Sequence, residues 1–174
     1  MAINPSLELT EVLLLCADIL EYPDEMYRDN VQRLGVLLND TTCTLPDWTQ
    51  EEIEAEHLHL FSIGASQKRT VLYAAWWRDG QMRGPTYRRI EAFYTDSGYA
   101  LDPDMLLPAD HLSVMLRFLS ILIEEGEMES AKAFSRFLTW LNDFEKSLES
   151  TSVLCSYPLA ARAAVHIVTT INET

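Results

Sequence analysis

The chain of 174 residues carries 27 acidic and 13 basic side chains, which gives a net charge of −14, and 48% of its residues are hydrophobic. A chain of this length suits a single domain, residues 1–174, which can bury roughly 70% of the surface that its unfolded form exposes. The hydrophobic fraction excludes extensive disorder, and the negative charge disfavours nucleic acids and anionic membranes as partners and favours basic ones. Many soluble proteins are acidic only to remain soluble, so the charge alone identifies no partner.

The three cysteines, Cys16, Cys43 and Cys155, are odd in number and far apart. Without a CxxC pair, neither a zinc ribbon nor a dithiol redox motif is available, and the pattern predicts a reducing compartment with no disulfide framework. Residues 1–5 lack the basic region of a secretory signal, and the longest apolar run, residues 71–77, is too short to cross a bilayer. We therefore expect a cytoplasmic protein that does not insert into a membrane.

The N-terminal third of the chain predicts three helices. The first is expected over residues 6–21 and ends before Pro23, because proline cannot continue the hydrogen-bond ladder. The second starts near Asp24, and after a loop over residues 39–47 the third follows the capping box Thr49–Glu52. Residues at helical spacing should form the inward faces. They are Leu9, Val12, Leu13, Cys16 and Leu20 in the first helix, Tyr27, Val31, Leu34 and Leu38 in the second, and Ile53, His57, Leu60 and Phe61 in the third.

The middle of the chain begins with a polar break over residues 62–68, followed by a dense aromatic segment over 73–77 and a loop over 79–85. Pro85 suits the first turn of a helix, and Gly98 suits its end. The apolar residues of that helix are Tyr87, Ile90 and Tyr94. These signals predict one further helix and an aromatic segment before it.

The C-terminal part predicts a long helix after Pro108, which Gly126 interrupts, a helix through residues 134–148, and an alanine-rich helix after Pro158. The apolar stripes are Leu112, Met115, Leu116, Leu119, Leu122 and Ile123 in the first of these, and Phe134, Phe137, Leu141, Phe144 and Leu148 in the second. With no convincing strand, the sequence predicts an all-α, single-domain bundle of about 6–8 helices.

Two histidines raise the question of a metal site. Glu54-x-x-His57 and Glu56-x-x-His59 each match the Glu-x-x-His unit of di-iron bundles, but residues two apart on a helix point about 200° apart and cannot share an ion. A di-iron site needs a second unit on another helix, and neither His111 nor His166 has an acidic residue three positions earlier. We expect no metal site, with one core-facing and one exposed histidine.

Motifs of catalysis are missing from the sequence. The six glycines form neither a nucleophile elbow nor a phosphate-binding loop, and no cysteine has a recognisable catalytic context. Most carboxylates lie on helix faces that we expect to be solvated. The sequence therefore predicts a binding protein and not an enzyme.

Two segments are candidates for a recognition surface. Trp76 and Trp77 are adjacent and point in different directions on a helix, so both are difficult to bury, although either one alone could equally belong to the core. Asp110 is placed to cap the long helix, where its charge suits the helix dipole, and a purely structural role is the commoner one for such a residue. His111, in the first turn, should be exposed or half-exposed.

The same segments resemble those of a known family. Residues 20–25 are similar to a Leu-x-Tyr-Pro-Asp-Glu element, and Leu72-Tyr73, Gly80 and Arg83-Gly84 are similar to a Leu-Tyr, Gly and Arg-Gly series. Further matches are residues 94–98, a Tyr-x-x-x-Gly element, and the Leu-Pro-Asp-His-Leu signature with the helix after it: Leu107, Pro108, Asp110, His111, Leu112, Val114, Leu116 and Phe118. In order and spacing, the chain resembles the assembly chaperones of the nitrate reductase delta-subunit type (NarJ), within the TorD/DmsD group of redox enzyme maturation proteins.

The chain also departs from the family pattern. Ala109 is inserted before Asp110, and Arg117 stands where the pattern has a glutamate. His57 and Ser62 replace a tyrosine and an aspartate, and the glycine–arginine loop is shorter. These departures widen the range of clients from nitrate reductase to selenate, chlorate, dimethylsulfide and hydrocarbon oxidoreductases.

The resemblance implies a TorD-like helical chaperone, monomeric or dimeric, that is not an enzyme. It would bind the apo form of the catalytic subunit of a molybdenum oxidoreductase of the nitrate reductase/DMSO reductase type, often through its N-terminal leader. It would assist insertion of the bis-molybdopterin guanine dinucleotide cofactor, which the client and not this chain carries. The alternatives are a stable accessory subunit of the reductase or a helical metal-dependent enzyme.

An acidic surface with exposed aromatic side chains suits a client segment that combines arginines with an apolar stretch. Asp110 is the expected partner of a client arginine, and His111 could position that pair or sense pH. The candidate client-binding residues are Tyr73, Trp76, Trp77, Arg83, Gly84, Pro108, Asp110, His111 and Leu112.

Overall fold

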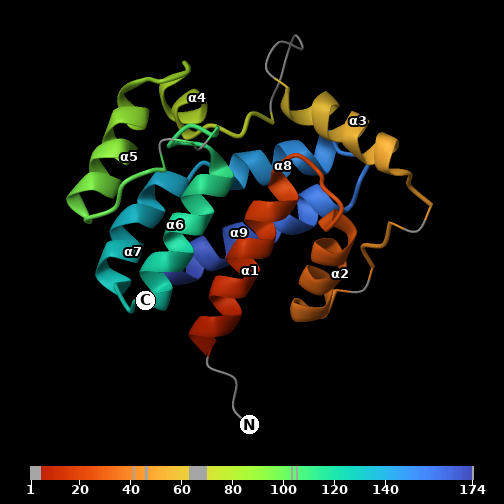
Figure 1. Cartoon of the computed structure of the whole chain (residues 1–174), viewed down its shortest axis with the longest axis horizontal. Helices are drawn as coiled ribbons and strands as arrows, with labels where there is room; N and C mark the ends of the chain where they lie inside the picture. The colour runs from red at the N-terminus through yellow and green to blue at the C-terminus, as the bar shows by residue number, and fades with distance from the viewer. Residues whose placement is uncertain are drawn as a thin grey trace.

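The computed structural model describes residues 5–40, 42–45, 47–62, 70–102, 104 and 106–173. In this part of the chain every regular element is a helix, in the order α1 (Pro5–Leu20), α2 (Tyr27–Leu37), α3 (Gln50–Phe61), α4 (Ala74–Asp79), α5 (Pro85–Asp96), α6 (Leu112–Glu124), α7 (Met128–Ser135), the 3-10 helix η1 (Arg136–Leu138), α8 (Leu141–Thr151) and α9 (Ser156–Glu173) (Figure 1). The all-α prediction is confirmed. Residues 1–4, and residues 63–68 of the expected polar break, lie outside the described residues, and the assignment of residues 1–174 to one domain stays a prediction.

The core forms where α1 packs against α2, α6 and α9, and α8 packs against α9. Figure 1 shows α1 crossing in front of α9. The predicted stripe of α6 is buried throughout, and burial of each leucine contributes about 1.5–3 kcal/mol. Small side chains on α9 let the neighbouring helices approach closely; the buried ones are Ala160, Ala161, Ala163 and Ala164. No helix among the described residues is long and apolar enough to cross a membrane.

Local signals place several helix ends where the sequence predicts them. At the start of α3, the Thr49 hydroxyl accepts from the backbone N–H of Glu52 at 3.2 Å, and the Glu52 carboxylate accepts from the backbone N–H of Thr49 at 2.8 Å. Pro85 is the first residue of α5. After α5, Gly98 has φ = 84°, a left-handed conformation that glycine adopts without a steric penalty. The capping box, the proline start and the glycine end are confirmed.

The expected continuous helix through residues 134–148 is wrong. The chain passes from α7 into η1 and then into α8, whose N-cap residue is Trp140. The break frees the backbone carbonyl of Arg136, which accepts a hydrogen bond from Arg78 Nη1 of α4 at 2.8 Å. Breaking the helix allows α7 to pack on α6 while α8 packs on α9, so the apolar spacing across the break reflects two helices that share one core.

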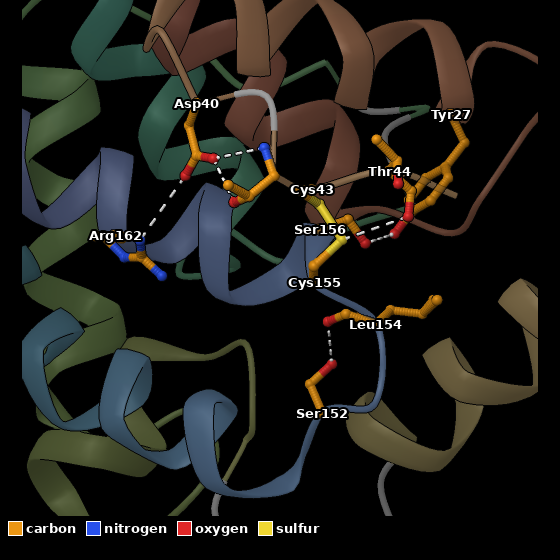
Figure 2. The surroundings of a disulfide bond; sticks show 10 residues. Tyr27, Asp40, Cys43, Thr44, Ser152, Leu154, Cys155, Ser156 and Arg162 are labelled. Atoms are coloured by element: carbon orange, nitrogen blue, oxygen red, sulfur yellow. Dashed lines mark hydrogen bonds and ion pairs between the residues drawn. A yellow bond between two sulfur atoms is a disulfide. The ribbon is translucent and has the colours of Figure 1, made fainter. Parts of the chain in front are cut away.

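The prediction that the cysteines form no disulfide is also wrong. Cys43 and Cys155, 112 residues apart, form a disulfide with a Cα–Cα distance of 5.4 Å, while Cys16 is free and buried. Figure 2 shows the bond joining the segment after α2 to the start of α9, next to the hydrogen bond between the Tyr27 and Ser156 hydroxyls. Nothing in the spacing predicts this pair, because only the packing of α2 and α9 brings the two cysteines together.

Candidate functional site

The two segments that the sequence singles out meet in space. The backbone N–H of Leu112 donates to the carbonyl of Leu72 at 2.8 Å, and the N–H of Ala74 donates to the carbonyl of Asp110 at 3.0 Å. Tyr73 and His111 form an isolated antiparallel bridge, and their rings lie edge to face with centroids 5.3 Å apart. The start of α4 and the start of α6 are therefore held together as one junction.

Asp110 supports this junction and does not cap α6. Its Oδ2 atom accepts a hydrogen bond from the N–H of Ala75 at 3.0 Å, at the start of α4. The N-cap of α6 is His111, whose Nδ1 accepts from the N–H of Ser113 at 3.3 Å. The predicted cap is thus wrong, because the free amides of α4 take both the carbonyl and the carboxylate of Asp110.

Burial also changes the expected roles of these two residues. Asp110 is 1% exposed, so it lies below the surface on which a client arginine would bind. Burial raises the pKa of this carboxyl group. His111 is 4% exposed, and the expectation that it is exposed or half-exposed is wrong. Its ring packs edge to face against that of Tyr73, so its position at the N-terminus of the helix does not bring it to the surface.

A groove with a volume of about 620 Å³ opens beside the junction. Its walls come from the end of α1 and the turn after it, from α3, from the segments before α4 and before α6 that meet at the junction, and from α6 itself. The lining residues are Leu20, Glu21, Tyr22, His57, Leu58, Phe61, Ser62, Leu72, Tyr73, Leu106, Leu107, His111, Val114 and Arg117. The groove therefore unites the segments that carry the family resemblance near residues 20–25, 72–73 and 107–114.

The groove has an apolar floor and two buried histidines. Burial lowers the pKa of both His57 and His111 to about 4, so both rings are neutral at neutral pH, which argues against pH sensing by His111 in that range. His57 packs among aromatic rings, with its centroid 4.9 Å from that of Phe61 and 5.5 Å from that of Tyr22. His59 is exposed, which confirms the expectation of one core-facing and one exposed histidine. The described residues contain no cluster of three or more histidine, cysteine or acidic side chains that could hold a metal ion.

Of the predicted binding residues, Tyr73 and His111 line the groove. The adjacent tryptophans point in different directions, and neither is fully buried: Trp76 is 42% exposed, while Trp77 is half-buried and stacks on Trp140 with ring centroids 5.6 Å apart. The indole N–H of Trp77 donates to the carbonyl of Val71 at 2.7 Å. Trp77 thus anchors α4 on the core, and Trp76 is the tryptophan available to a partner.

The remaining predicted residues lie outside the groove lining. Pro108 is half-buried, Leu112 is fully buried and Arg83 is exposed. Gly84 is buried because the Asp79 side chain packs against it. In that position Asp79 accepts from the N–H and hydroxyl of Thr86 at 2.7 and 2.8 Å, and so caps α5. The Arg83-Gly84 element therefore has a structural role at the start of this helix.

Replacing Gly84 with alanine should cost about 1–2 kcal/mol of the free energy of unfolding. The new Cβ would lie 2.5 Å from Asp79 Oδ2 and 2.9 Å from Asp79 Cβ, so Asp79 must move and lose its bonds to Thr86. Urea unfolding measures the loss. In an Asp79→Gly background, which removes both the carboxylate and the Cβ that the new side chain meets, the same Gly84→Ala change should cost much less; an equal cost in both backgrounds would contradict this explanation.

A comparison with known protein families tests the resemblance found in the sequence. A family model described as nitrate reductase delta subunit matches residues 24–150. The chain belongs to the nitrate reductase delta subunit family. The resemblance inferred from the sequence motifs is thereby confirmed.

The delta subunit fold also occurs in a solved structure. The chain is similar to a protein from Archaeoglobus fulgidus described as a redox enzyme maturation protein, with a TM-score of 0.64 and 23% sequence identity, over 100% of this chain and 97% of that chain. At this identity the likeness establishes the fold alone, and it confirms the TorD-like helical architecture. No curated protein sequence matches the chain significantly.

Several groove residues of this delta subunit family member were not among the sequence candidates. Tyr22 lies within the motif over residues 20–25, so the resemblance could have identified it. Arg117 is marked only by its departure from the family pattern. Leu58 and Leu106 carry no sequence signal, because an exposed leucine on a helix or in a loop looks like any other until its neighbours are known.

Proposed function

We propose that this member of the nitrate reductase delta subunit family is a cytoplasmic chaperone for the catalytic subunit of a molybdenum oxidoreductase of the nitrate reductase/DMSO reductase type. It binds the apo form of that subunit through its N-terminal segment, and releases it after the bis-molybdopterin guanine dinucleotide cofactor of the client has been inserted. The chain itself performs no catalysis and holds no cofactor. The observation that carries the proposal is the groove beside the junction of α4 and α6.

The groove exposes apolar surface that a client segment would cover. Tyr22 is 54% exposed, Leu58 51% and Leu106 97%, and all three line it. Large apolar side chains grouped at one concave site typically mark a binding surface. Covering them gains roughly 25 cal/mol for each Å² removed from water. This favours an apolar client segment.

The charge of the chain favours a basic client segment. The net charge of −14 attracts cations over a distance of about a Debye length, and Glu21 lies in the wall of the groove. Trp76, exposed on the neighbouring helix α4, offers a flat aromatic face to an arginine. An N-terminal segment that combines arginines with an apolar stretch meets both requirements.

The test is a pull-down with the full chain from anaerobically grown source cells, followed by mass spectrometry and a molybdenum assay on the complex. We expect a molybdenum oxidoreductase catalytic subunit that contains no molybdenum. Recovery of the cofactor-loaded, mature enzyme would instead identify a stable accessory subunit. Recovery of no oxidoreductase, together with stoichiometric metal on this chain, would support a metal-dependent enzyme.

Substitutions in the groove locate the binding surface. We expect Leu58→Gln combined with Leu106→Gln to reduce the recovered client at least about ten-fold, because two exposed apolar contacts are lost without disturbing the core. The matched control is Val36→Gln on α2, which like Leu58 is apolar, helical and exposed, but lies outside the groove. Equal loss of client in the control and in the double variant would place the binding surface elsewhere.

A further inference from the structure

Arg117, in the wall of the groove, pairs with two carboxylates: that of Glu21, which also lines the groove, and that of Asp18, which does not. Its Nη2 atom lies 2.6 Å from Asp18 Oδ1 and 3.0 Å from Glu21 Oε1, and its Nε atom lies 3.3 Å from the same Glu21 oxygen. Asp18 belongs to α1, Glu21 follows it, and Arg117 comes from α6. The Arg117 side chain is 41% exposed, and those of Asp18 and Glu21 are 35% and 32% exposed. All three side chains are therefore accessible to water and to a ligand.

Arg117 lies between two neighbouring hollows along α6. Val114 and Arg117 line the groove and also a second hollow of about 200 Å³, whose other walls include Tyr99, Phe118 and Ile121. His111, Val114, Phe118 and Ile121 recur at helical spacing, so both hollows follow one face of α6. Arg117 lines both hollows, so a ligand in either one would lie next to the guanidinium group that pairs with Asp18 and Glu21.

Glu21 and Arg117 neutralise each other in the groove. Among its described lining residues, Glu21 is the one acidic side chain, and Arg117 is the one arginine or lysine. An ion pair that is this accessible to water is weak, so another cation can displace Arg117 at a small cost. A guanidinium group is the best-matched competitor, because its planar donors fit two carboxylates as those of Arg117 do.

We propose that Arg117 occupies, in the free chain, the place that an arginine of the bound client segment takes against Asp18 and Glu21. This inference rests on the proposed function, because it assumes that the client segment lies in the groove. On binding, the client arginine replaces Arg117, whose side chain turns into solvent. Only a segment with its own guanidinium group can replace Arg117 in this way, so the ion pairs of the free chain favour client segments that contain arginine.

Two synthetic peptides test the inference by isothermal titration calorimetry with the full chain. One carries a single arginine before a run of leucine and alanine, and the other has citrulline, the neutral isostere, in place of arginine. We expect Arg117→Met to raise the preference for the arginine peptide over the citrulline peptide about three- to five-fold, because the internal competitor is gone. Adding Asp18→Asn and Glu21→Gln should abolish this gain.

The control is Arg33→Met, which removes the same charge from an ion pair with Glu11 that lies outside the groove. An unchanged preference in Arg117→Met, or an equal rise in Arg33→Met, would overturn the inference. The proposed function survives that result if the citrulline peptide still binds and is lost in the Leu58→Gln and Leu106→Gln variant. If neither peptide binds to the unchanged chain or to Arg117→Met, the groove fails as the site of the client segment and the inference fails with it.

Discussion

Reduction of the disulfide between Cys43 and Cys155 should lower the free energy of unfolding by about 2–4 kcal/mol. The bond joins positions 112 residues apart, so it removes a large part of the conformational freedom of the unfolded chain. It also ties the segment after α2 to the first residues of α9, near the hydrogen bond between Tyr27 and Ser156. We expect the loss to appear in guanidinium chloride unfolding with and without a reductant.

The double variant Cys43→Ser and Cys155→Ser provides the control. It should unfold as the reduced chain does and should not respond to the reductant. Thiol titration of the denatured, non-reduced chain should find Cys16 alone, since Cys16 is the free cysteine. Three titratable thiols, or equal stability of the oxidised and reduced chains, would contradict the prediction.

The same titration bears on where the protein works. A cytoplasm buffered by glutathione keeps most protein thiols reduced, whereas an oxidising compartment preserves disulfides. If the proposed cytoplasmic location is correct, the pair should be reduced in cells that are lysed under thiol-blocking conditions and should oxidise on exposure to air. A fully oxidised pair in freshly blocked cells would argue against that location.

Acidification from pH 7 to pH 5 should destabilise the protein through His57 and His111 by about 1–2 kcal/mol for each ring. Burial lowers the pKa of both from the usual 6.5 to about 4. The unfolded chain therefore binds protons as the pH falls through 6.5, while the folded chain does not until about pH 4. The stability from the neutral rings is complete above the unfolded pKa and is lost below it.

Urea unfolding across this pH range measures the effect as a difference between variants, because the many carboxylates also respond to pH. His57→Gln and His111→Asn should each flatten the pH dependence, and the asparagine retains an oxygen that can cap α6. His59→Gln is the matched control, because His59 lies on the same helix as His57 but is exposed. If the two variants keep the pH dependence of the unchanged chain, the buried rings are not its source.

The local features of the fold could be predicted from the sequence. Thr49 and Glu52 cap a helix, Pro85 begins one and Gly98 ends one, because each of these effects depends on residues only a few positions apart. The apolar stripe of α6 likewise needs only its own spacing. Such signals determined the all-α class, most helix ends and the family.

The arrangement of the candidate site was decided by the tertiary structure. Asp110 has the right residue type to cap α6, but the amides of α4, more than thirty positions earlier, take it. The groove joins residues near positions 20, 57, 72, 106 and 117, and Arg117 meets Asp18 from 99 positions away. The disulfide spans a comparable distance. Such contacts depend on how the helices pack, and packing is a sum over the whole chain that no local pattern encodes.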